Sequence, residues 1–88
     1  MEQEKLNLRL TRHAREKISI RKISIEDIQK IILNPDWEEF DKFDNTLTHL
    51  IGKIGDRFLR VIGRFEDDEL FVVVSAFFDR RIKRKDKK

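Results

Sequence analysis

The stretch LFVVVSAFF, residues 70–78, contains a single polar residue, Ser75. Its apolar side chains fall on both faces of an extended chain, which is typical of a strand that is covered from both sides. We therefore expect it to be the central and most buried strand of a sheet. Phe71, Val72 and Val74 should be among its buried side chains.

The segments upstream of this strand alternate between polar and apolar residues with a period of two. RFLRVIGRF (57–65) places Arg60 and Arg64 on one face, and the acidic turn EDDE joins it to the next strand. TLTHLIGKI (46–54) alternates in the same way, with a turn expected at 52–56. WEEFDKF (37–43) is more polar, which suggests an edge strand.

The first third of the chain predicts a short strand and two helices. KLNLRL (5–10) alternates, and Thr11 and Ser24 are good N-caps for the helices that follow. The dipeptide Asn34-Pro35 should end the second helix, because the residue before proline avoids the helical region. We expect an α+β fold, β-α-α-β-β-β(-β), with two helices packed on one face of a mainly antiparallel sheet. It should form a single domain over residues 1–78, followed by a basic C-terminal tail at 79–88.

The composition excludes several classes of site. The chain has 88 residues, no cysteine and two histidines, so we expect no disulfide, no metal site and no cofactor. No apolar run approaches the roughly 20 residues that span a bilayer. The charged N-terminus also lacks the apolar region of a signal peptide, so we expect a cytoplasmic protein without a membrane partner.

Charge is distributed in blocks, although the net charge is only +3. Residues 1–22 sum to +4, residues 23–44 to −5 and residues 79–88 to +5. A basic tail of this kind either binds phosphates or simply keeps the chain soluble. The acidic middle argues against a protein that coats nucleic acid over its whole surface.

The chain resembles the DUF4258 family, which is grouped with the RelE/ParE-like toxin fold. The resemblance rests on TRHA (11–14), RKIS (21–24), Asn34-Pro35 and LRV (59–61). It implies a toxin-like domain that binds or cleaves RNA, with an antitoxin protein as a further partner. Two departures are visible: Lys22 stands where the family usually has glycine, and the chain lacks the tyrosine that several RelE-type enzymes use.

The first predicted helix carries the residues that suit this chemistry. His13, Lys17 and Arg21 are four residues apart and therefore share one face of the helix. The helix start is unusual, because its positive end receives Arg12 and His13 where acids are preferred. Metal-free RNA cleavage needs a base for the 2′-hydroxyl proton and cations for the charge that develops on phosphorus.

We therefore take His13 as the candidate base, with Arg21 and Arg60 as the other catalytic candidates. The candidates for nucleic-acid binding are Arg12, Lys17, Arg64, Arg80, Arg81, Lys83, Arg84 and Lys85. In the alternative interpretation, His13 is a structural residue, and the side chains of Lys17 and Arg21 are simply solvated. Arg60 would then pair with acids of segment 37–41, and His49 would be a half-buried structural residue.

Three functions remain open on the sequence. The first is the toxin half of a toxin–antitoxin pair, a possible metal-independent endoribonuclease. The second is a non-catalytic nucleic-acid- or protein-binding module on the same fold. The third is a structural partner whose exposed strand, at WEEFDKF, pairs with another chain.

Overall fold

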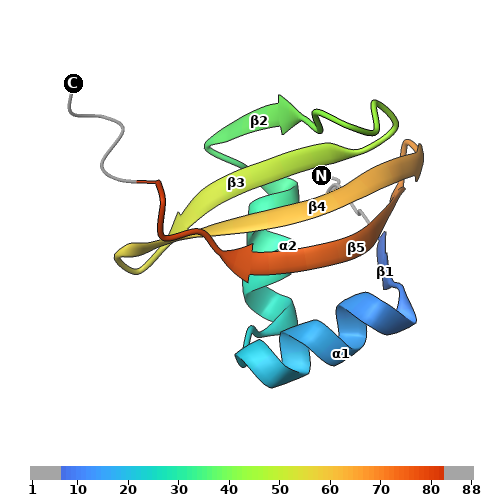
Figure 1. The fold of residues 1–88 in the computed structure, drawn as a ribbon. Coiled ribbons are helices and arrows are strands. Elements are labelled where there is room, and N and C mark those ends of the chain that lie inside the picture. Colours follow the sequence, from blue (N-terminus) through green and yellow to red (C-terminus); the bar gives the residue numbers. More distant parts are fainter. Residues whose placement is uncertain (1–6, 83–88) are drawn as a thin grey trace, which may run out of the picture.

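The computed structural model describes residues 7–82 (Figure 1). Its elements are β1 (Asn7–Leu10), α1 (Arg12–Arg21), α2 (Ile25–Leu33), β2 (Trp37–Phe40), β3 (Thr48–Ile54), β4 (Arg57–Asp67) and β5 (Leu70–Phe78). The class is α+β, as expected, and all four strands after the helices are present. The first strand is described from Asn7 onward.

The five strands form one mixed sheet in the order β1-β5-β4-β3-β2. Three neighbouring pairs are antiparallel, and β1 lies parallel to β5. The expectation that residues 70–78 form the central strand is therefore wrong, because β4 lies in the middle. The pairing with β1 covers only residues 70–73, so the outer edge of β5 beyond Val73 pairs with no strand among residues 7–82.

The main core lies between the two helices and one face of the sheet (Figure 1). Its buried members are Ala14, Ile18, Ile23, Ile28, Ile31, Ile32, Leu50, Leu59, Val61, Phe71, Val73 and Ala76. Side chains alternate between faces along a strand, so the residues between these core positions point to the other side. We call that side, opposite α1 and α2, the far face. Two of its residues, Ile51 and Val72, are also buried.

The ends of the helices follow the local sequence signals. The Thr11 and Ser24 hydroxyls accept hydrogen bonds from the backbone N–H groups of Ala14 and Asp27, at 3.1 and 3.0 Å. Asn34 is the C-cap of α2. Lys22 ends α1 in the left-handed conformation with φ 57°, the conformation in which glycine is usually found.

Three local expectations need correction. The turn between β3 and β4 is confined to Gly55 and Asp56, while Gly52 lies buried within β3. The strand expected at 37–43 ends at Phe40. Val74 is only half-buried, because the register of β4 and β5 shifts there and Val74 has no partner.

Candidate functional site

A network of charged side chains crosses the far face of the sheet, with Arg60 of β4 at its centre. The Arg60 Nε donates a hydrogen bond to Oδ2 of Asp79 at 2.8 Å. Its Nη1 donates to Oε1 of Glu39 at 3.1 Å and to Nδ1 of His49 at 2.8 Å. The network thus joins β2, β3, β4 and the segment that follows β5.

The geometry around His49 fixes its tautomer. Arginine has no acceptor atom, so His49 Nδ1 must accept the bond from Arg60. The proton of a neutral ring then lies on Nε2, which is 2.7 Å from Oδ1 of Asp41. Both ring nitrogens of His49 are therefore occupied, as expected of a half-buried structural residue.

Asp79 is the buried acid of the network, with 4% of its surface exposed. Its carboxylate accepts bonds from the Arg81 side chain at 3.1 and 3.2 Å, from the Arg81 backbone and from Arg60. The bonds from Arg81, followed by those of Arg60, lower the pKa of Asp79 from 3.8 to about 2. The carboxylate is therefore ionised in the folded protein at neutral pH.

The other two acids of the network are also held in their ionised form. Hydrogen bonds from Trp37 and then Arg60 lower the pKa of Glu39. The hydrogen bond with His49 lowers the pKa of Asp41. The pairing of Arg60 with an acid of segment 37–41, which the sequence left open, is thus observed with Glu39. Much of the Arg60 charge is compensated within the protein.

The second feature is the open edge of β5, where α1 packs. The backbone N–H of Thr11, just before α1, donates to the carbonyl of Val73 at 3.1 Å. At the other end of α1, Arg21 Nη1 donates to the carbonyl of Ala76 at 2.8 Å. The Arg21 guanidinium also lies 5.9 Å from the centre of the Phe77 ring. Since Phe77 is the cross-strand neighbour of Arg60 on the far face, Arg21 links α1 to that face.

Helical geometry places His13 and Lys17 on the same side of α1 as Arg21. Arg15 points to the opposite side, where it lines a groove with α2 and β1. At 100° per residue, His13 and Lys17 lie about 160° away from Arg15 around the helix. His13 is exposed and makes no hydrogen bond or ion pair with other residues in 7–82. It does not bond to Arg21 or Arg60.

The remaining candidates are dispersed. Arg12 and Arg80 are exposed, and Lys17 is half-buried. Arg64 donates from Nε to Glu66 at 2.9 Å, and Arg81 is engaged with Asp79. The candidates Lys83, Arg84 and Lys85 lie outside the described residues.

Phe77 and Asp79 are not among the site residues expected from the sequence. Phe77 lies in the strand that the apolar pattern predicts to be buried on both faces, although its side chain is half-exposed. Asp79 belongs to the segment that the charge pattern predicts to be a basic tail, because cationic residues follow it. A useful signal was the arginine in the middle of a strand, since a partly buried guanidinium requires a carboxylate nearby.

The family of the chain follows from its sequence match. Residues 10–78 match the family model described as "Domain of unknown function (DUF4258)", so the chain belongs to this family. No curated protein and no solved structure matches the chain. Among residues 7–82, neither helix is long and apolar enough to cross a membrane.

Proposed function

We propose that this domain binds RNA along the open edge of β5 and the adjoining part of the far face. The observation that carries the proposal is the position of Arg21. It extends from α1 across the strand edge to Phe77, whose neighbour is Arg60. A cationic row on the helix and an aromatic ring on the sheet thereby form one continuous surface.

Each part of this surface suits a different part of a single-stranded RNA. A half-exposed phenylalanine ring on a sheet offers a platform on which a base can stack. Arg21 and Lys17 would contact phosphates, because neither of them forms an ion pair with another residue in 7–82. Arg60 is already held by Glu39 and Asp79, so its main role would be to support the surface.

For cleavage, His13 is the better candidate of the two histidines. Its ring nitrogens are free of hydrogen bonds within the described part of the chain, whereas both nitrogens of His49 are occupied. His13 would take the proton from the 2′-hydroxyl, and the 2′-oxygen would attack the adjacent phosphorus. The bond from phosphorus to the 5′-oxygen would break, leaving a 2′,3′-cyclic phosphate and a 5′-hydroxyl protonated by solvent.

The finer proposal is that the domain is the toxin half of a toxin–antitoxin pair, with the RelE/ParE-like fold. It is supported by the resemblance carried by the motifs TRHA and RKIS. The rival function, a non-catalytic binding module, is favoured by the compensated charge of Arg60. Expression in a bacterial host tests the toxin role: growth should stop, and the product of an adjacent reading frame should restore it.

Binding and cleavage are separable by experiment. Labelled single-stranded RNA should bind with an affinity that falls steeply with salt. Arg21→Gln and Phe77→Leu should each weaken binding several-fold, whereas Lys30→Gln on α2 should not. His13→Gln should retain binding but abolish formation of the cyclic phosphate. Binding without cleavage would establish the binding module, and equal affinity in Arg21→Gln and Lys30→Gln would refute the proposed surface.

A further inference from the structure

The free edge of β1 borders a groove of about 430 Å³ that the RNA proposal does not use. It is lined by Asn7, Leu8, Arg9, Leu10, Arg15, Ile25 and Gln29. All four residues of β1 are among them, so the groove follows the edge of the strand. β1 is an end strand of the sheet, which leaves its outer side unpaired by the strands described here.

The backbone of β1 presents hydrogen-bonding groups to this groove. Asn7 and Thr11 donate from their N–H groups to carbonyls of Glu69 and Val73, at 2.7 and 3.1 Å. Because backbone groups point alternately to the two sides of a strand, those of Leu8 and Leu10 point away from β5. They form a ready template for one more strand.

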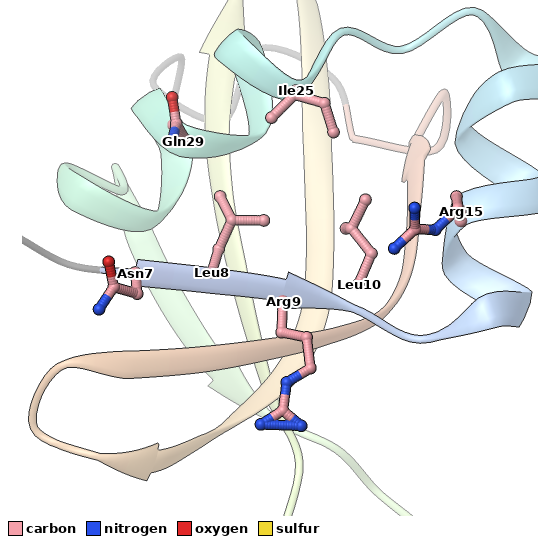
Figure 2. Close-up of a pocket in the computed structure, with 7 residues that line it drawn as sticks. All are labelled: Asn7, Leu8, Arg9, Leu10, Arg15, Ile25 and Gln29. Atoms are coloured by element: carbon pink, nitrogen blue, oxygen red, sulfur yellow. The ribbon is translucent and has the colours of Figure 1, made fainter.

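The side chains around the groove differ on the two sides of β1 (Figure 2). Leu8 and Leu10 point toward the helices, where Ile25 of α2 lies opposite them and Arg15 extends from α1. Ile25 is 40% exposed, so it offers an uncovered apolar contact. Arg9 points the other way, toward the far face. Among residues 7–82, the lining contains two arginines and no acidic residue.

We infer that this edge binds an extended peptide segment of a partner protein, in which aliphatic and acidic side chains alternate. The peptide would pair with the backbone of Leu8 and Leu10 as an added strand. Its aliphatic side chains would pack on Leu8, Leu10 and Ile25, and its acidic side chains would meet Arg9 on the other face. An acid at the end of the aliphatic row would reach Arg15.

The test uses the full chain and the acetylated probe peptide EVEIEVE. The peptide should bind and slow the hydrogen exchange of the Leu8 and Leu10 amides, while KVKIKVK and the scrambled peptide EEVIVEE should not. Arg15→Glu should weaken binding about threefold or more. This change keeps the fold, since an acid suits the first turn of a helix. Lys53→Glu, the same charge change on β3, should leave the affinity unaltered.

Several results would overturn the inference. One is peptide binding that leaves the exchange of Leu8 and Leu10 unchanged, and another is an equal effect of Arg15→Glu and Lys53→Glu. A third is protection of these two amides by single-stranded RNA in place of the peptide, which would assign the groove to nucleic acid. Protection that appears with rising protein concentration alone would assign it to a second copy of the chain.

Discussion

Asp79→Asn should destabilise the protein by about 2 kcal/mol at neutral pH, and the loss should disappear in acid. The pKa of Asp79 falls from 3.8 to about 2 on folding. At 1.36 kcal/mol per unit this corresponds to slightly more than 2 kcal/mol. The expected loss of stability is set at about 2 kcal/mol because the ion pair with Arg81 is partly screened: the Arg81 side chain is 80% exposed to solvent.

The sign of the pH dependence follows from the direction of the shift. A carboxyl group with a lowered pKa in the folded state stabilises the protein above its unfolded pKa. That stability is lost as the pH falls toward the folded pKa. The wild type should therefore lose its advantage over Asp79→Asn between about pH 4 and pH 2. Asparagine resembles the protonated aspartate in shape, so the two proteins should then be nearly equal in stability.

Urea denaturation followed by fluorescence of Trp37, the single tryptophan, measures the difference at each pH. In thermal melts about 2 kcal/mol corresponds to a shift of roughly 8–16 °C for a domain of this size. Asp68→Asn, in the exposed turn before β5, is the matched control and should change stability by less than about 0.5 kcal/mol. If the difference in stability between the wild type and Asp79→Asn stays unchanged from pH 6 to pH 2, then packing, not charge, makes Asp79 important. If Asp79→Asn loses no more stability at neutral pH than the control Asp68→Asn, the ion pairs of Asp79 contribute nothing.

Three further predictions concern single positions. Val73→Asp should prevent folding, since Val73 is fully buried, whereas Val74→Asp at the half-buried bulge should give a soluble, cooperatively melting protein. If Val74→Asp fails to fold and Val73→Asp folds, the register of β4 and β5 is contradicted. Lys22→Gly should stabilise by up to about 1 kcal/mol because Lys22 has φ 57°, while Lys30→Gly within α2 should destabilise by a similar amount in the same denaturation assay. His13→Glu should stabilise the free protein by roughly 0.3–1 kcal/mol, because the first turn of α1 has no acid. The same change should weaken RNA binding. A loss of stability would show that His13 is a structural group.

Local sequence signals were sufficient for the type and order of the elements and for the faces of β4, but not for every boundary or for the bulge at Val74. The caps at Thr11 and Ser24 involve contacts three residues apart, so the sequence carries them directly. Alternation along 57–65 correctly put Arg60 and Arg64 on the face opposite Leu59 and Val61. Alternation cannot give the strand order, because the pairing of β1 with β5 joins residues more than sixty positions apart. The apolar pattern of residues 70–78 therefore predicts that β5 is the central strand, whereas β4 lies in the middle of the sheet.

The candidate site, too, could be predicted only in part, because some of its contacts join residues that are far apart in the sequence. The row His13, Lys17 and Arg21 follows from helical spacing alone, but its connection to Phe77 depends on α1 packing against the outer edge of β5. That edge is open because β1 is short and pairs only with residues 70–73. Had β1 continued along β5, it would have occupied the carbonyl of Ala76 that Arg21 now binds. The length of the first strand thus determines whether the cations of α1 can reach the far face of the sheet.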